Sequence, residues 1–134
     1  MLGWRLNEIN HWGNIMLKLV YCVRRKQGMS FEEFSKYWLE VHGGLSKKLK
    51  KYMPTFVRYV QSHTIYGEET DRLRASRNAD EPFDGITEAW FDNDIEVTDV
   101  DAQMDAMSKM LADELNFIDM ENSVVFYTWE HEIF

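Results

Sequence analysis

Four stretches of the chain have the composition and spacing of β-strands. They are rich in β-branched and aromatic residues, and apolar side chains recur at every second position. These predicted strands span residues 15–24, 56–66, 84–92 and 122–131. The first is mostly apolar on both faces, which is typical of a strand that is covered on both sides. A chain of 134 residues has helices for only one face of such a sheet, so we expect the other face to meet a second subunit.

A helix is predicted after the first strand, and it begins at a capping box. Ser30 is followed three residues later by Glu33, the pattern in which each side chain bonds a backbone N–H at a helix start. Phe34, Trp38 and His42 then recur at a spacing of four and share one side of the helix.

Two glycines follow this helical pattern. Gly43 and Gly44 are predicted to end the helix through a left-handed cap, since glycine adopts that conformation without strain. Residues 45–52 resume as a basic helical turn or two, and Pro54 stops them.

Residues 94–118 are predicted to form the second helix, with Asp99 or Asp101 as a cap within it. Its apolar positions recur at intervals of three and four and predict an inward stripe. That stripe consists of Met104, Met107, Leu111, Leu115 and Ile118. The polar connection at 67–83 is long for a compact domain, and such connections are often lids or binding loops.

The order of predicted elements is β-α-β-β-α-β, which indicates an α+β, ferredoxin-like fold. This fold has a four-stranded antiparallel sheet with both helices on one face. Residues 15–134 are predicted to form this domain, and residues 1–14 an N-terminal extension. The uncovered face would expose aromatic and apolar side chains, so a homodimer through that face is expected.

The net charge bears on nucleic-acid binding, and the uneven distribution of charged residues along the chain has more than one explanation. The net charge of −8 argues against a general nucleic-acid binder. Residues 45–52 carry four lysines and no acid, whereas residues 92–121 carry ten acids and one lysine. Two solvated helix faces explain this pattern most simply. The alternatives are complementarity between subunits, or a basic rim that attracts an anionic ligand.

Cysteine content and hydropathy indicate the cellular compartment of the protein. The single cysteine, Cys22, lies in a predicted strand, permits no internal disulfide and fits a reducing compartment. We interpret it as a structural thiol. No segment reaches transmembrane length, and the N-terminus has no apolar signal-peptide core, so a cytoplasmic protein without membrane contact is predicted.

The strongest candidate for chemistry is His42, whose ordinary pKa suits proton transfer near neutral pH. The alternative is a histidine that bonds the last carbonyls of its helix. His63 lies in the second strand and is interpreted either as a ligand contact or as a core or interface histidine. The two histidines alone do not make a metal site. Nucleotide-binding and nucleophile motifs are also missing, so neither metal nor organic cofactor is expected.

Other side chains are candidates for shaping a ligand site. Hydroxyl donors for a carbonyl or phenolate are Tyr21, Tyr59 and Tyr127. Glu88 needs a partner if it faces inward, and it is ordinary if it faces outward. Trp38 and Trp90 would wall an aromatic pocket, although packing in the core explains each of these aromatic residues as well.

Five blocks of the sequence lie in order and with compatible spacing over roughly residues 16–133. They are KLVYCVRR at 18–25, YWLEVHG at 37–43, YVQSHT at 59–64, FDGITEAWFD at 83–92, and DE with FID within 113–119. Together these blocks resemble the EthD family. The resemblance implies a dimeric α+β barrel, in which two ferredoxin-like sheets pack face to face. In that family the histidine corresponding to His42 is usually followed by Gly-Pro, whereas Gly43 and Gly44 stand here.

The resemblance also implies a class of activity. Relatives of this fold include cofactor-independent monooxygenases, isomerases and lyase-like enzymes of aromatic or polyketide compounds. We therefore predict a small enzyme-like protein that moves protons on an aromatic or polyketide-like carbonyl compound, with His42 as the catalytic acid/base. The alternative is a noncatalytic dimer that binds a small apolar ligand or supports an oxygenase system for ether degradation.

Overall fold

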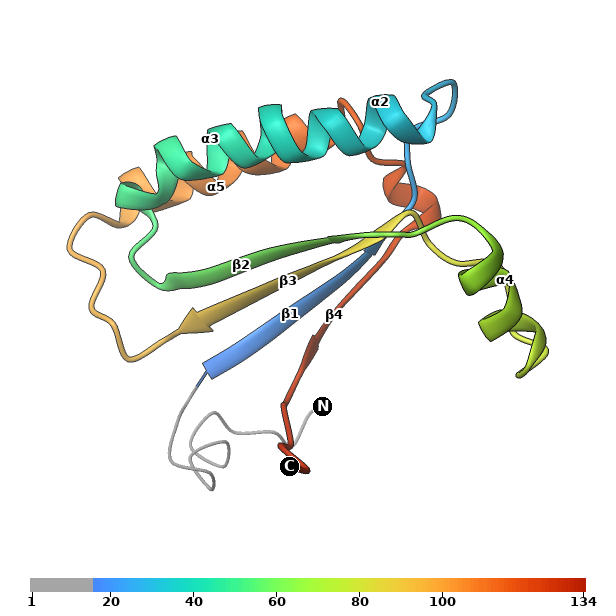
Figure 1. Cartoon of the computed structure of the whole chain (residues 1–134). Coiled ribbons are helices and arrows are strands. Elements are labelled where there is room, and N and C mark those ends of the chain that lie inside the picture. Colours follow the sequence, from blue (N-terminus) through green and yellow to red (C-terminus); the bar gives the residue numbers. More distant parts are fainter. Residues whose placement is uncertain (1–15) are drawn as a thin grey trace.

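The computed structural model describes residues 16–134 and contains one four-stranded antiparallel sheet (Figure 1). Its strands are β1 (Met16–Val23), β2 (Phe56–His63), β3 (Gly85–Asp92) and β4 (Val124–Thr128). They are arranged in the order β2-β3-β1-β4. The α+β, ferredoxin-like prediction is confirmed, while β4 is shorter at both ends than predicted. The predicted N-terminal extension, residues 1–14, lies outside the described residues.

The first helical segment is continuous from Phe31 to Tyr52. It comprises α2 (Phe31–Lys36), a π-helical turn η2 (Tyr37–His42), α3 (Gly43–Leu49) and a 3₁₀ turn η3 (Lys50–Tyr52). The predicted cap is present, because the backbone N–H of Glu33 donates to Ser30 Oγ at 3.1 Å.

The prediction that Gly43 and Gly44 end this helix is wrong. Gly43 has right-handed helical angles, φ −61° and ψ −40°, and its N–H donates to the carbonyls of Trp38 and Glu40. The bond to Trp38 spans five residues, so the helix widens at this turn and then continues. Glycine permits a left-handed cap but does not impose one.

The second long helix, α5 (Val100–Glu114), is shorter than predicted and is rotated relative to the predicted inward stripe. Asp99 caps it by accepting from the N–H of Ala102 at 3.0 Å. The buried positions are Ala106 and Met110. Of the predicted inward residues, Met104 and Leu115 are 63% and 58% exposed, whereas Ile118 is buried. Met107 and Leu111 are 41% and 57% exposed, although both line a cavity between the helices and the sheet. The small Ala106 lets α5 approach α3 closely, and this contact sets the rotation of the helix.

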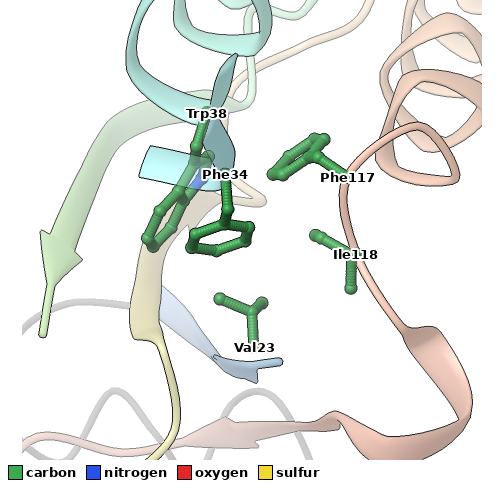
Figure 2. Close-up of a cluster of buried hydrophobic side chains, with 5 residues drawn as sticks. All are labelled: Val23, Phe34, Trp38, Phe117 and Ile118. Atoms are coloured by element: carbon green, nitrogen blue, oxygen red, sulfur yellow. The ribbon is translucent and has the colours of Figure 1, made fainter. Parts of the chain in front are cut away.

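Helices α2, α3 and α5 lie side by side over one face of the sheet (Figure 1). Between them and the sheet lie two buried clusters. The Trp38 cluster consists of Val23, Phe34, Trp38, Phe117 and Ile118 (Figure 2). The Met53 cluster consists of Leu49, Met53, Ala106 and Met110.

A glycine in β3 permits the dense packing of the Trp38 cluster. A Cβ atom on Gly85 would lie 2.4 Å from the Trp38 ring and 2.6 Å from the carbonyl oxygen of Ser62. Any side chain at this position would therefore push the indole away from the sheet.

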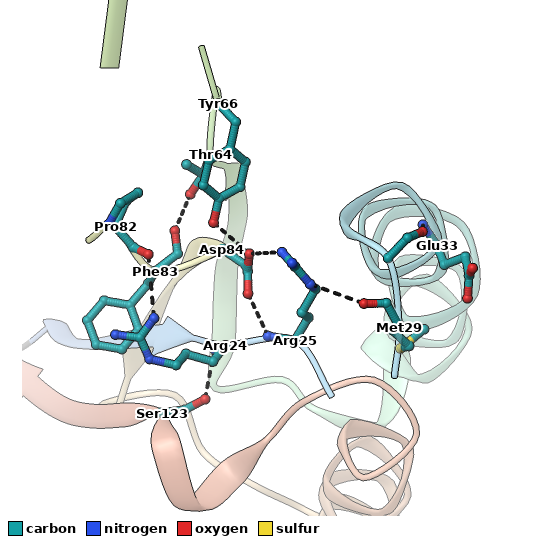
Figure 3. Close-up of polar contacts among 11 residues, drawn as sticks. Arg24, Arg25, Met29, Glu33, Thr64, Tyr66, Pro82, Phe83, Asp84 and Ser123 are labelled. Carbon is teal, nitrogen blue, oxygen red and sulfur yellow. Dashed lines mark hydrogen bonds and ion pairs between the residues drawn. The ribbon is translucent and has the colours of Figure 1, made fainter. Parts of the chain in front are cut away.

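The connection between β2 and β3 carries a short helix, α4 (Glu68–Ala75), which lies apart from the other helices (Figure 1). Beside it, the buried carboxylate of Asp84 accepts three hydrogen bonds (Figure 3). These come from Arg25 Nη1 at 2.6 Å, the backbone N–H of Arg25 at 2.8 Å and the Tyr66 hydroxyl at 2.6 Å. We call this group the Asp84 network, and it closes the end of the sheet.

No helix within residues 16–134 covers the opposite face of the sheet. Its apolar part includes Ile86, Val124 and Phe126, which are 39%, 47% and 47% exposed. The other part is charged, because Lys18 pairs with Glu88 at 2.5 Å and with Glu130 at 3.6 Å. The expected aromatic and apolar face is thus only half of what the sheet presents. In the same described range, no helix has the length and apolar run needed to cross a bilayer.

Candidate functional site

A cavity of about 590 Å³ lies between the helices and the sheet, bordered by the Trp38 cluster and the Met53 cluster. Most of its wall is apolar. The strands contribute Leu19, Tyr21, Phe56, Tyr59, Thr87, Ala89, Phe91 and Val125. The helices contribute Trp38, His42, Met107, Ser108, Met110, Leu111 and Glu114. The few polar groups in this apolar wall are therefore those able to orient a ligand.

A β-bulge adapts β2 to this cavity. The pairing of β2 with β3 shifts between Phe56 and Arg58, so that Phe56 pairs with Phe91 and Arg58 with Trp90. Simple alternation along β2 would put Phe56 and Tyr59 on opposite faces, because they are three residues apart. The extra residue in β2 brings both rings to the cavity, with centroids 5.8 Å apart.

His42 lies at the end of the π turn, is only 5% exposed and lines the cavity. Its Nδ1–H donates to Asp113 Oδ2 at 2.8 Å. The other oxygen of Asp113 accepts from the Tyr37 hydroxyl at 2.6 Å and from Asn116 Nδ2 at 3.1 Å. Asp113 thus holds the imidazole in the tautomer that leaves the Nε2 lone pair available.

The charge state of this pair follows from its burial. Desolvation lowers the pKa of His42 below its ordinary 6.5, although Asp113 acts in the opposite direction. Desolvation opposes ionisation of Asp113, but hydrogen bonds from Tyr37, His42 and Asn116 lower its pKa overall. Near neutral pH the pair is therefore a neutral imidazole and a carboxylate.

The Tyr59 hydroxyl is oriented by two donors. It accepts from Gln61 Nε2 at 2.9 Å and from Trp38 Nε1 at 3.3 Å. Both lone pairs are thereby occupied, so the O–H is left to donate, to the neighbouring Thr87 or to a ligand in the cavity. Burial raises the pKa of Tyr59, so this hydroxyl keeps its proton.

Gln61 connects this hydroxyl to the π turn. Its Nε2 also donates to the Trp38 carbonyl at 2.8 Å. That carbonyl accepts the five-residue bond from Gly43 as well. A Cβ atom on Gly43 would lie 3.6 Å from Gln61 Nε2, which is an ordinary contact distance, so the amide packs directly against this glycine. The widened helical turn is therefore fixed to the sheet at the point where His42 and Tyr59 meet.

Glu114, at the C-terminal end of α5, places a carboxylic acid in the cavity wall. Burial raises its pKa from 4.5 to about 7, while a hydrogen bond from Tyr21 acts against this rise. Burial and the charge of Glu114 in turn raise the pKa of Tyr21 to about 12. Near neutral pH, Glu114 therefore exists in both protonated and ionised forms.

His63 differs from His42 in its hydrogen bonds and in its position outside the cavity. Its Nε2–H donates to Gln61 Oε1 at 2.9 Å, and its Nδ1 lies 2.5 Å from Ser35 Oγ. Its ring stacks on Trp38 with centroids 4.3 Å apart. His63 does not line the cavity, and both ring nitrogens are already paired. These contacts support the core interpretation of this histidine.

The structure brings four of the predicted site residues to the cavity: Tyr21, Trp38, His42 and Tyr59. It places Glu88 and Trp90 on the open face of the sheet, among charged neighbours. The Trp90 ring lies between Lys18 at 4.9 Å and Arg58 at 4.5 Å, and its Nε1–H donates to Glu130 at 2.5 Å. Glu88 thus has the outward orientation, with Lys18 as its partner.

Tyr127 pairs with Leu19 on the helix side of the sheet, but it is 62% exposed and lies outside the cavity wall. No residue of the 67–83 connection lines the cavity either, so the expected lid does not cover it in this structure.

Two residues of the site, Asp113 and Glu114, were not among the predicted site residues. They stood in an acidic stretch that was interpreted as a solvated helix face. The missed signal is their spacing, because Asp113 continues the buried line of Ala106 and Met110 at intervals of four and three.

Metal ligands do not converge in the described part of the chain. No group of three or more histidine, cysteine, aspartate or glutamate side chains there could hold an ion.

A smaller hollow of about 390 Å³ lies between α3 and β2 and shares Met53, Phe56 and Tyr59 with the cavity. Lys47 and Lys50 line it, which gives the suggested basic rim a place in the fold. The anionic ligand remains a hypothesis.

Comparison with solved structures supports the fold. An EthD family protein from Bacillus halodurans aligns with a TM-score of 0.54 and 14% identity, over 87% of this chain and 99% of that one. An EthD-like protein from Ralstonia eutropha aligns with a TM-score of 0.50 and 16% identity, over 84% and 89%. A hypothetical protein from Arabidopsis thaliana gives a TM-score of 0.50 and 14% identity, over 88% and 90%.

Comparison with curated proteins finds no match. In the comparison with protein families, residues 26–121 match the EthD domain, which covers most of the described chain and all the groups around His42. The chain belongs to the EthD family.

Proposed function

We propose that the protein is an enzyme that moves a proton between carbon and oxygen in an aromatic carbonyl compound. The observation that carries this proposal is the arrangement of His42, whose Nδ1–H is held by Asp113 while the ring lines an apolar cavity. The apolar walls suit an aromatic ligand of moderate size. No group outside this chain is needed for the proton transfer.

Two groups divide the chemistry. His42 Nε2, as the neutral base, removes a proton from the carbon next to the carbonyl group. The C–H electron pair becomes a C=C bond, and the carbonyl π pair moves to oxygen. The oriented Tyr59 hydroxyl donates a hydrogen bond to that oxygen as its charge develops. Return of the proton from His42 to carbon or to oxygen completes an exchange or an isomerisation.

The pH dependence follows from the charge of His42. Only the neutral imidazole acts as the base, so activity is lost as the pH falls through the pKa of His42. Because burial lowers that pKa below 6.5, full activity persists to a lower pH than an exposed histidine would allow.

The test uses benzylacetone, a simple aromatic ketone, as the probe in deuterated water. Proton NMR measures loss of the signals from the carbons next to the carbonyl group. We expect wild-type protein to accelerate this exchange, His42→Ala to reduce it to background, and Tyr59→Phe to reduce it by roughly 10²-fold. A matched control is Asp105→Asn, which changes an exposed carboxylate of α5 outside the cavity and should leave exchange close to wild type.

Absence of exchange with wild-type protein at saturating probe would overturn the proposal. Retention of benzylacetone in native mass spectrometry without exchange would instead support the noncatalytic ligand-binding alternative.

We also propose that two copies associate through the open face of the sheet. Exposed Ile86, Val124 and Phe126 support this proposal, since contiguous apolar side chains are stabilised by burial against a partner. Sedimentation equilibrium distinguishes the expected dimer from a monomer, and Phe126→Asp should shift the distribution toward the monomer.

A further inference from the structure

The cavity wall includes a carboxylic acid that enolisation of a ketone does not use. Glu114 lines the cavity next in sequence to Asp113, which orients His42. It lies at the end of α5 and faces the sheet. Its charge contributes to raising the pKa of Tyr21 in β1 and of Tyr59 in β2. The neighbouring wall from the C-terminal part of the chain is uncharged, made of Ile118, Met120, Ser123 and Val125.

Glu114 therefore shares one apolar space with a base and with a fixed hydrogen-bond donor. Among these groups, Tyr59 donates a hydrogen bond but keeps its proton, and His42 arrives neutral and takes a proton. A ketone that only enolises uses those two groups and leaves Glu114 without a role. A carboxylic acid at this place suits a ligand with a second oxygen function.

We propose that Glu114 is the general acid of the site, and that the preferred ligands are aromatic β-hydroxy ketones, which lose water there. This inference rests on the function proposed above for His42 and Tyr59, and it adds the substrate class and the second proton transfer.

The step balances as an elimination. His42 Nε2 takes the proton from the carbon between the two oxygen functions, and the C–H electron pair forms the new C=C bond. The C–O bond to the hydroxyl group breaks as Glu114 transfers its proton to the departing oxygen, which leaves as water. The products are a conjugated enone, a Glu114 carboxylate and a His42 imidazolium. Transfer of one proton from His42 to Glu114 restores the starting state, and no oxidant or reductant is required.

The groups around Glu114 determine how the rate of dehydration should depend on pH. Four titratable groups surround it: Tyr21, His42, Tyr59 and Asp113. Dehydration needs neutral His42 together with protonated Glu114, so its rate falls at low pH through His42 and above about pH 7 through Glu114. Exchange of the simple ketone needs neutral His42 and the Tyr59 hydroxyl but not Glu114, so it should lack the alkaline limb.

The experiment uses two probes that differ by one hydroxyl group, benzylacetone and the aldol adduct of benzaldehyde with acetone. Dehydration of the adduct gives benzalacetone, whose conjugated absorbance is followed continuously. We expect Glu114→Gln to lower kcat for dehydration by roughly 10²-fold or more, with a small change in KM, and to slow exchange of benzylacetone far less. The glutamine keeps an acceptor for Tyr21 but has no acidic proton to give.

Two further variants separate an acid from a merely structural carboxylate. Tyr21→Phe removes the hydrogen bond that holds down the pKa of Glu114, so the alkaline limb should move to higher pH. Asp105→Asn, on the solvent side of the same helix, is the matched control and should leave both reactions unchanged.

The outcomes are distinguishable. If wild-type protein exchanges benzylacetone but does not dehydrate the adduct, or if Glu114→Gln dehydrates it at the wild-type rate, the inference about Glu114 is wrong and the proposed function stands. If wild-type protein does neither, both fail. An alkaline limb that Tyr21→Phe leaves in place would also overturn the assignment of Glu114.

Discussion

The Trp38 cluster and the cavity beside it use the same helix and the same face of the sheet, yet one is filled and the other is hollow. Phe34, Trp38 and Phe117 are at most 1% exposed and their rings pack against one another, with centroids 5.3 to 5.8 Å apart between neighbours. The cavity wall includes Met107 and Leu111, which are 41% and 57% exposed. Stability is thus concentrated at one end of the layer, which lets the other end keep space for a ligand.

Each region also holds one carboxylate by hydrogen bonds, and the two carboxylates differ in the groups that donate to them. Asp84 is held by the Arg25 guanidinium, a permanent cation, and by Tyr66. Asp113 is held by a neutral imidazole, a tyrosine and an asparagine. A guanidinium is a permanent cation that gives up no proton at ordinary pH, whereas a histidine carries a proton that can move. The first arrangement serves the fold, and the second can serve chemistry.

The sharpest contrast in stability should come from truncating one apolar side chain in each region. Phe34→Ala removes a buried ring from the Trp38 cluster and should lower the free energy of unfolding by about 3–5 kcal/mol. Leu111→Ala, in the cavity wall, should lower it by less than about 1 kcal/mol, because that side chain is already half exposed. Urea unfolding followed by tryptophan fluorescence measures both, and equal losses would refute the distinction.

The Asp84 network offers the next largest effect. Asp84→Asn keeps the shape of the side chain but leaves the Arg25 guanidinium without its carboxylate, which should cost about 3 kcal/mol. The value lies at the low end for a buried pair, because the Arg25 side chain is 38% exposed and can partly reach water. Glu69→Gln, an exposed change on α4, should stay within about 0.5 kcal/mol in the same unfolding experiment. A loss below 1 kcal/mol for Asp84→Asn would show that the network is dispensable for folding.

The smallest expected effect is the pH dependence of stability at Glu114. Its pKa rises from 4.5 to about 7 on folding, so the native state binds the proton more tightly than the unfolded chain. The resulting stabilisation is complete below pH 4.5 and is lost as the pH rises through about 7. Allowing for partial exposure, the loss is on the order of 2 kcal/mol.

Comparison with Glu114→Gln isolates this contribution. His42 acts in the opposite sense, since its lowered pKa makes the native state lose stability as the pH falls below 6.5. Subtracting the unfolding free energies of the variant from those of wild type between pH 4.5 and 8 removes the His42 effect from the result. A difference that does not change with pH would contradict the raised pKa of Glu114.

Local signals in the sequence were enough to predict the elements of the fold. The Ser30 cap, the alternation in the strands and the four-residue spacing of Phe34, Trp38 and His42 depend on neighbouring residues only. The same patterns placed His42, Tyr21, Trp38 and Tyr59 on the sides that meet in the cavity.

The parts that sequence patterns missed depend on packing between distant segments. The rotation of α5 is set by Ala106 against α3, and a larger apolar stripe elsewhere on the helix masks this small residue. Placing Phe56 requires the bulge in β2, which alternation alone does not show. Asp113 and Glu114 become site residues only when α5 lies beside the π turn, because their sequence context is that of any acidic helix.

The π turn lets this helix hold one residue more than a regular helix of the same length. Successive residues of an α-helix are about 100° apart, so residues four apart drift by about 40° around the axis at every step. The wider turn at Tyr37–His42 offsets this drift and keeps Phe34, Trp38 and His42 over the sheet. Deleting exposed Leu39 would close the wide turn into a regular helix and leave both halves facing the sheet. Deleting one residue from α5, which is regular, would instead turn all that follows it by about 100°. A change of one codon is therefore absorbed beside His42, whereas in α5 it would displace Asp113 and Glu114.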